Sequence, residues 1–175
     1  SLSRFLLANP ENAHVRKLVA NTQIKLQRNL DALETLVPLI REQSRDADAL
    51  ILAGGANVML NKPKVAAKFY ERALVADPKS AAAHIALAQV QSAAGDHGNA
   101  RSHLKKAIEL EPANLQAVYA LARVHHASRE YDQALAVLAD IEKKWPNRIE
   151  TPVLKAQVLF DMKDVAGARR TLEAR

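Results

Sequence analysis

Apolar residues recur along this chain at the spacing of amphipathic helices, and short turns interrupt the pattern at regular intervals. The stretch 114–146 reads as two such helices joined by a tight connection and closed by a proline. Its landmarks repeat: Pro78, Pro112 and Pro146 are spaced by 34 residues, and Pro10 lies twice that distance before Pro78. Because proline cannot continue a helix and pushes the preceding residue out of helical geometry, each proline predicts the end of a helix.

Three further columns of residues share this period. Small residues that let two helices of one unit cross closely are expected at Ala20, Gly54, Ala88, Ala122 and Ala156. A second small column, where the first helix of the next unit is expected to pack, consists of Ala32, Ala66, Ala100, Ala134 and Ala168. Four residues later come larger side chains that should fill the resulting groove: Leu36, Tyr70, Leu104, Leu138 and Leu172.

Capping residues mark where each unit begins. Good N-cap residues stand at Asn12, Asp46, Ser80 and Asn114, and the fifth member of the column, Arg148, is a weak cap. The predicted units are 12–45, 46–79, 80–113, 114–147 and 148–175, after a partial unit 1–11 that packs through Phe5, Leu6 and Leu7. Expected helices lie near 13–26, 30–43, 47–60, 63–76 and 97–110, and Pro38 should kink or shorten the second of these.

A fixed 34-residue period with two helices per unit is typical of tetratricopeptide repeats, and the chain is identified as a member of that (TPR) superfamily. Leu87-Ala88 and Leu121-Ala122 match the first-helix pattern of the family, and Ala100-Leu104-Ala107 matches the second. The resemblance implies an all-α solenoid, a right-handed superhelix of about five antiparallel helix pairs in one continuous array. Lys155 departs from the pattern at the leucine site of the last unit.

A narrower resemblance rests on three segments. Pro10-Glu11-Asn12-Ala13, Lys68-Phe69-Tyr70-Glu71-Arg72-Ala73, and Gly95-Asp96 followed by Ala100 are similar to the TPR-rich lipoproteins of bacterial exosortase (PEP-CTERM) systems. That resemblance implies a part in exopolysaccharide production or surface-protein sorting, at a periplasmic or outer-membrane-anchored location with the lipid anchor outside this chain. A cytoplasmic location is the alternative. Because both ends fall inside predicted units, the chain is expected to be a fragment of a longer protein.

Composition limits which metal sites, disulfides and catalytic residues the chain could contain. The chain is 49% apolar and 4% aromatic, which suits helices packed through small residues, and with no cysteine it can hold neither a disulfide nor a thiolate metal site. No apolar run is long enough to span a membrane. The six histidines form no helical pair at i, i+4 with a glutamate between them, and side chains of the adjacent His125 and His126 point about 100° apart. Solvated or packing histidines are therefore favoured, and no catalytic residue, metal or cofactor is expected.

The first helices should line an inner, concave face suited to a peptide or a partner protein. The residues expected there are Lys17, Asn21, Ile51, Gln89, Tyr119, Arg123, His126, Gln157 and Phe160. Phe160 is expected beside Tyr119, Arg123 and His126, although Tyr119 could instead pack between adjacent first helices. Lys17 with Asn21 resembles the first pair of the carboxylate clamp of chaperone-binding TPR proteins, but the remaining clamp residues are absent. The sequence thus favours a non-catalytic interaction scaffold, with a plain solvated groove as its alternative.

A net charge of +6 raises a second possibility, a polyanion or acidic polysaccharide binder. Its residues would form a basic strip along second helices: Lys64, Lys68, Arg72, Arg101 and Lys105. Glu71 and Glu109 interrupt the strip, which favours an ordinary solvated face. No aromatic platforms accompany the strip, so nucleic acid is not expected as a partner. Salt would separate the two hypotheses, because binding through the strip should weaken as salt rises.

Overall fold

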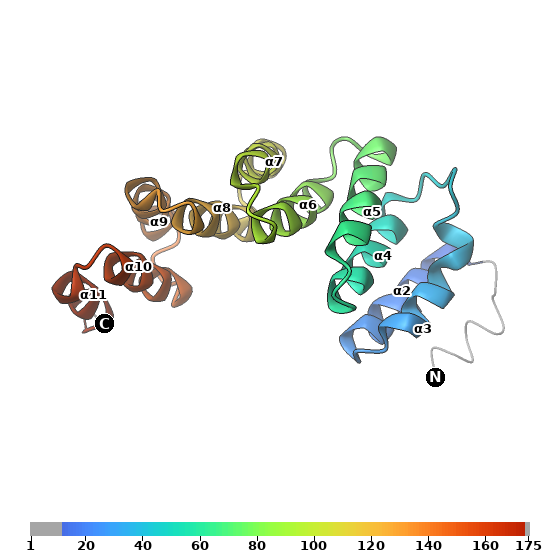
Figure 1. Ribbon diagram of the computed structural model, residues 1–175, viewed down its shortest axis with the longest axis horizontal. Coiled ribbons are helices and arrows are strands. Elements are labelled where there is room, and N and C mark those ends of the chain that lie inside the picture. Colours follow the sequence, from blue (N-terminus) through green and yellow to red (C-terminus); the bar gives the residue numbers. More distant parts are fainter. Residues whose placement is uncertain (1–11, 174–175) are drawn as a thin grey trace. The chain divides into compact units, whose positions relative to one another are not determined.

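The computed structural model describes residues 12–173, and every regular element in that range is a helix (Figure 1). In chain order these are α2 (Ala13–Lys25), α3 (Asn29–Leu36), the 3-10 helix η1 (Val37–Leu39), α4 (Ala47–Met59), α5 (Pro63–Ala76), α6 (Ala81–Ala93), α7 (His97–Leu110), α8 (Leu115–Ala127), α9 (Tyr131–Lys144), α10 (Glu150–Asp161) and α11 (Val165–Glu173). The predicted class, an all-α solenoid of helix pairs, is confirmed. The predicted partial unit 1–11, with Phe5, Leu6 and Leu7, lies outside the described residues.

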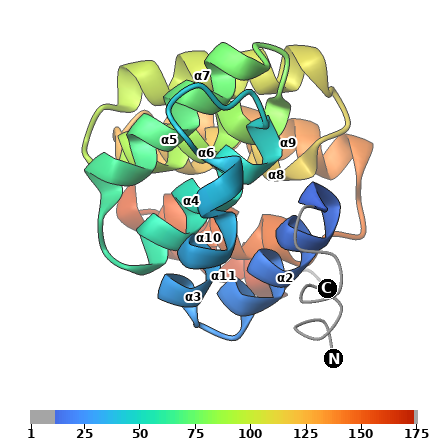
Figure 2. The ribbon, with the colours of Figure 1, turned by 90° about the vertical axis from the view of Figure 1, so that its right-hand side faces the viewer.

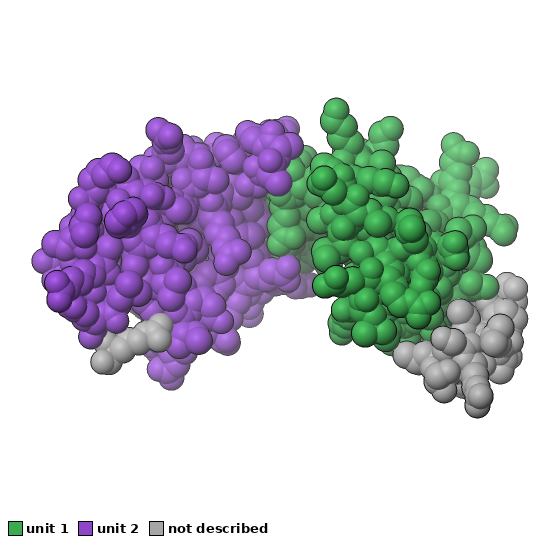
Figure 3. Space-filling view, turned by 60° about the horizontal axis from the view of Figure 1, so that its bottom comes forward, with its two compact units in different colours: residues 1–91 green, residues 92–175 purple. Residues whose placement is uncertain are grey.

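The chain divides into two compact units, residues 1–91 and residues 92–175 (Figure 3). The boundary falls in the last turn of α6. Within the first unit, α2 and α3 lie side by side in both ribbon views (Figures 1 and 2), and α4 pairs with α5. Within the second unit, α8 pairs with α9 and α10 pairs with α11. Each unit is therefore built from helix pairs of the kind that the sequence period predicts.

The predicted caps start four of the first helices. The side-chain oxygens of Asn12, Asp46, Ser80 and Asn114 each accept a hydrogen bond from the backbone N–H three residues on, at 3.0–3.2 Å. Before α10, no side chain caps the helix, as the weak column member Arg148 predicts. Each cap satisfies one N–H that a helix start would otherwise leave unpaired.

The turns inside the helix pairs share one backbone feature, which recurs at the same 34-residue period. Backbone φ is positive, between 56° and 83°, at Gln27, Asn61, Gly95, Arg129 and Lys163, which are 34 residues apart. After Gln27, Asn61, Arg129 and Lys163, the N–H of the next residue donates to a carbonyl five residues earlier, as from Arg28 to Gln23 at 2.8 Å. This is the Schellman ending of a helix, which requires a left-handed residue. Only the third unit has a glycine, Gly95, at this position.

The small-residue columns pack as predicted, with one exception in the large column. Ala88 and Ala122 are fully buried, and Leu104 and Leu138 are also at 0% exposure. Leu172, expected to fill the same groove, is 51% exposed, so that prediction is wrong. The helix that would bury this column in the other units has no counterpart over α11 among the described residues.

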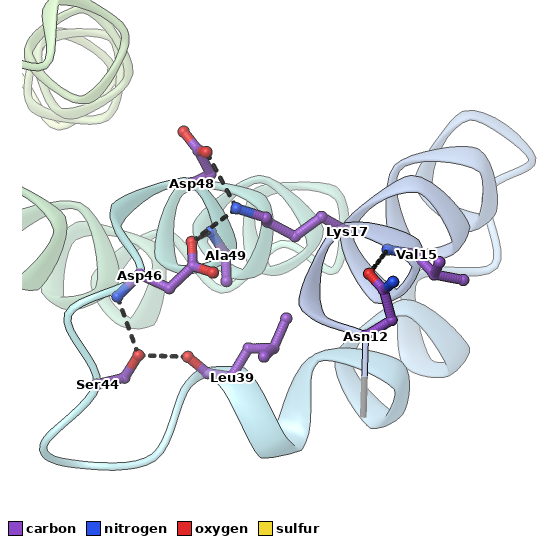
Figure 4. Close-up of polar contacts among 8 residues, drawn as sticks. All are labelled: Asn12, Val15, Lys17, Leu39, Ser44, Asp46, Asp48 and Ala49. Atoms are coloured by element: carbon purple, nitrogen blue, oxygen red, sulfur yellow. Dashed lines mark hydrogen bonds and ion pairs between the residues drawn. The ribbon is translucent and has the colours of Figure 1, made fainter. Parts of the chain in front are cut away.

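Pro38 ends a helix early. The second helix of the first unit was expected to reach residue 43, but α3 stops at Leu36 and η1 follows, with Pro38 inside it. Proline lacks the N–H that the α-helical pattern needs, so the chain continues only in the tighter form. The loop that follows is held by Ser44, whose hydroxyl donates to the Leu39 carbonyl and accepts from the Asp46 N–H (Figure 4).

Candidate functional site

In the first unit, side chains of the first helices enclose a hollow of about 350 Å³. Its lining residues come from α2, α4 and α6: His14, Lys17, Leu18, Asn21, Asp48, Ile51, Leu52 and Ala82. The predicted inner-face residues Lys17, Asn21 and Ile51 are therefore brought together here. Leu18 is 44% exposed, so the hollow combines apolar surface with charged and amide groups.

Lys17 in this hollow is already bound to two carboxylates (Figure 4). Its ammonium nitrogen lies 3.1 Å from Asp46 Oδ1 and 3.1 Å from Asp48 Oδ2. Burial disfavours the charged ammonium, but the hydrogen bonds and charges of the two aspartates outweigh burial and raise the pKa of Lys17. Asp46 also caps α4 through the Ala49 N–H at 3.0 Å. The pair links α2 to α4, so Lys17 is not a free cation for a peptide carboxylate.

In the second unit, α10, α11 and one residue of α8 enclose a larger hollow of about 690 Å³. Its lining residues are His126, Val153, Ala156, Gln157, Phe160, Asp161, Val165, Ala168, Arg169 and Leu172. Three predicted inner-face residues, His126, Gln157 and Phe160, meet in it. Phe160 is 59% exposed and Val153 is 47% exposed. A large apolar area thus faces solvent beside the Gln157 amide.

Two hydrogen bonds join α8 to α10, and the one between His126 and Asp161 lies in the lining of this hollow. His126 Nε2 lies 2.7 Å from Asp161 Oδ2, and the Tyr119 hydroxyl lies 2.6 Å from the Thr151 hydroxyl. Thr151 is almost completely buried and Tyr119 is half-buried against the core of α8–α10. Tyr119 therefore packs between adjacent first helices, the alternative role that its position allowed, and it does not line the hollow.

Besides Tyr119, two further predicted inner-face residues line neither hollow. Gln89 on α6 and Arg123 on α8 are exposed and line neither of them. Sequence reasoning also missed contributors to the second hollow, above all Asp161 and Leu172. The sequence offered one indication that Asp161 belongs to the hollow: it directly follows Phe160, a predicted inner-face residue. Its pairing with His126, 35 residues away, depends on tertiary contact.

The basic strip is partly used inside the protein. Arg72 donates to the backbone carbonyls of Ile40 and Arg41 at 3.0 and 2.6 Å, and its guanidinium lies over the Phe69 ring. The Arg72 guanidinium therefore satisfies two carbonyl groups that follow the α3–η1 segment. Lys64 and Lys68 remain exposed on α5.

Arg101 is likewise engaged in the second unit, whereas Lys105 on the same helix is exposed. Arg101 Nη1 lies 3.0 Å from Glu130 Oε1, and His125 Nδ1 lies 2.6 Å from Glu130 Oε2. The hydrogen bond from His125, followed by the charge of Arg101, lowers the pKa of Glu130. This cluster ties α7 to the turn between α8 and α9, which leaves Arg101 little role as a free anion ligand.

Over residues 12–173 the side chains provide no group of three or more histidine, cysteine, aspartate or glutamate residues placed to hold a metal ion. In the same range, none of the helices has the length and apolarity needed to cross a membrane. The charged groups that converge form small clusters that link structural elements, such as His126 with Asp161 and Lys17 with Asp46 and Asp48. The arrangement offers surfaces for contact with another molecule.

These observations define a class: a repeat protein of helix pairs that carries solvent-exposed hollows between its helices. The chain belongs to the tetratricopeptide repeat superfamily. Models described as tetratricopeptide repeat match residues 18–81 and residues 91–150. Proteins of this superfamily are protein-interaction scaffolds, in general without catalytic activity. The superfamily assignment made from the 34-residue period is thereby confirmed.

Solved structures share the fold. A tetratricopeptide repeat protein from Parabacteroides merdae is similar at 15% identity, with a TM-score of 0.84, over 99% of this chain and 69% of that one. A thermophilic TPR protein from Thermus thermophilus is similar at 25% identity, with a TM-score of 0.79, over 91% of this chain and 87% of that one. YrrB, described as a TPR protein with an unusual peptide-binding site, matches at 20% identity, with a TM-score of 0.73, over 99% and 89%.

Proposed function

We propose that this chain is a non-catalytic scaffold that binds a peptide or a partner protein on the inner faces of its first helices. The observation that carries the proposal is the face of α10, a first helix, where Phe160, 59% exposed, shares a hollow with Gln157 and with His126 of α8. An exposed aromatic ring in a concave, largely apolar site gains free energy when a partner covers it. Aromatic side chains are also among the residues that most often dominate binding energy at interfaces.

The chemistry of the hollow suits a peptide better than a rigid small molecule. Gln157 offers both an amide donor and a carbonyl acceptor, which can pair with a peptide backbone. Val153 lies four residues before Gln157 and Phe160 lies three residues after it, so all three share one helix face and offer contact for apolar side chains. The peptide-binding site named for YrrB, a protein of the same fold, supports this class of ligand.

The test is selection of binding peptides from a random library against this protein, followed by titration of the selected peptides. Phe160→Ser combined with Gln157→Ala should weaken binding by about 2 kcal/mol, or roughly thirtyfold in Kd, with unchanged helicity. The matched control is Lys64→Ala with Lys68→Ala, two exposed residues of the basic strip. If the control weakens binding and the hollow variant does not, and if binding also collapses with salt, the polyanion hypothesis replaces this one.

We further propose, on the sequence resemblance alone, that the protein acts in an exosortase (PEP-CTERM) or exopolysaccharide setting, held at the periplasmic or outer-membrane side by a lipid anchor outside this chain. The support is the set of segments at 10–13, 68–73 and 95–100. Cell fractionation of the natural full-length protein, with labelling by a lipid precursor, tests this location. Recovery of unlabelled protein in the cytoplasmic fraction would refute it.

A further inference from the structure

The last helix pair breaks the internal pattern at one position. Lys155 on α10 stands in a column whose other members are apolar and at most 8% exposed: Val19, Ala53, Leu87 and Leu121. In the other units this column is therefore part of the buried core. A charged side chain there costs packing energy, and departures from an otherwise consistent pattern are expected where function requires them.

A cavity accompanies the departure. It measures about 850 Å³ and lies between the end of α9, the connection 145–149, α10 and α11. Ile149, Pro152 and Leu159 provide apolar wall, and Arg148 and Arg170 stand at its polar side. This volume is within the range of sites that bind small molecules. The cavity is separate from the hollow that carries the proposed peptide site, and its lining shares no residue with it.

The two carboxylates that line this cavity have hydrogen-bond partners, whereas its two arginines have no ion-pair partner among the described residues. The Glu142 carboxylate is bound by Lys155, whose Nζ lies 2.8 and 3.1 Å from its two oxygens. The Asp164 carboxylate accepts the Gly167 N–H at 2.8 Å, where it caps α11. By contrast, neither Arg148 nor Arg170 forms an ion pair with any other residue of the range 12–173. The positive charge that remains available in the cavity is thus that of two guanidinium groups.

We propose that this cavity binds a small anion that carries a carboxylate or phosphate group on an apolar ring or chain. The planar donors of Arg148 and Arg170 match the oxygen atoms of either group. Ile149, Pro152 and Leu159 cover the apolar part of the ligand. Lys155 serves as a positioning residue: by neutralising Glu142, it prevents a free carboxylate from repelling the anion.

The experiment titrates the protein with phthalate and with phenyl phosphate at fixed ionic strength, followed by calorimetry, with inorganic phosphate as the reference probe. The two aromatic anions distinguish a carboxylate ligand from a phosphate ligand. We expect at least one of them to bind several-fold more tightly than inorganic phosphate, because only the aromatic anions can use the apolar wall. Equal binding of all three would indicate charge attraction alone and would overturn the proposal.

Arg148→Gln and Arg170→Gln should each weaken binding of the preferred anion about tenfold, since each removes a charge-assisted hydrogen-bond donor. The matched control is Arg28→Gln, the same change at an exposed residue that pairs with Asp31 and does not line the cavity. Lys155→Leu restores the residue type of the other units and should also weaken binding several-fold with helicity retained. Unchanged affinity in both cavity-arginine variants, or an equal loss in the control, refutes the site.

Discussion

The single glycine in the small-residue column offers a sharp test of how these helix pairs fit together. A methyl group added to the backbone at Gly54 would place its carbon within 2.7 Å of ring atoms of Tyr70, which is 4% exposed. The other units combine alanine in this column with leucine in the large column, whereas this unit combines glycine with tyrosine. We therefore expect glycine to be required here because the ring occupies the space of a methyl group.

The expected size of the effect follows from two opposed contributions. Gly→Ala inside a helix normally stabilises by about 1 kcal/mol, because alanine loses less backbone entropy. Against that, overpacking a buried ring costs about 1–3 kcal/mol. Gly54→Ala should therefore have a net effect between neutral and a destabilisation of about 2 kcal/mol, centred at about 1 kcal/mol. The neighbouring Gly55 is the matched control, since its nearest contact is the Tyr70 hydroxyl at 4.0 Å, and Gly55→Ala should stabilise by about 0.5–1 kcal/mol.

Urea unfolding followed by circular dichroism measures these free energies, and Tyr70→Leu completes a double-mutant cycle. In the Tyr70→Leu background the ring is gone, so Gly54→Ala should become neutral or stabilising. The resulting coupling energy should be about 2 kcal/mol. If Gly54→Ala and Gly55→Ala have the same effect, or if Tyr70→Leu leaves the effect of Gly54→Ala unchanged, the argument from the ring is wrong.

Three further outcomes are expected. Ala122→Leu should destabilise by about 1–3 kcal/mol in urea unfolding because it overpacks a fully buried helix crossing, while Ser102→Leu on an exposed surface should change little; similar losses would contradict the packing register. Burial raises the pKa of Tyr70 to about 12, so the folded state holds the phenol proton more tightly than the unfolded chain does. The stability that this contributes is intact below about pH 10 and should be lost as the pH rises towards about 12. An ultraviolet absorbance titration should show one tyrosine that ionises at higher pH than the others. If a Tyr70→Phe variant still shows this high-pH ionisation, the assignment to Tyr70 is wrong. Gln27→Gly should stabilise the folded protein by about 0.5–1 kcal/mol, because φ is 59° there and glycine adopts this conformation without strain. Thermal melting should show a higher Tm, and an unchanged or lowered Tm would refute the expectation.

The location of the candidate site was only partly predictable. The period placed His126, Gln157 and Phe160 on one expected face, and they do line one hollow. For Tyr119 the same periodicity could not distinguish solvent from a neighbouring helix, and its hydroxyl in fact meets Thr151. Arg72 and Arg101 looked like available cations, because their acceptors lie 27 to 32 residues away in the chain. Helical spacing fixes the direction of a side chain, but the partner that it meets depends on the neighbouring element.

The sequence alone determined the class of fold, the helix pairs and most helix ends. Those properties are local and repeated: a cap acts on an N–H three residues away, a proline removes its own N–H, and a 34-residue period fixes which faces must be small. Tertiary structure decided how far each surface is covered, so that Leu138 is fully buried while Leu172, one period later, is 51% exposed. It also decided which charges remain free, because an ion pair such as Lys155–Glu142 forms only after helices pack. Burial and charge pairing are properties of contacts between elements, and no single helix carries the information that sets them.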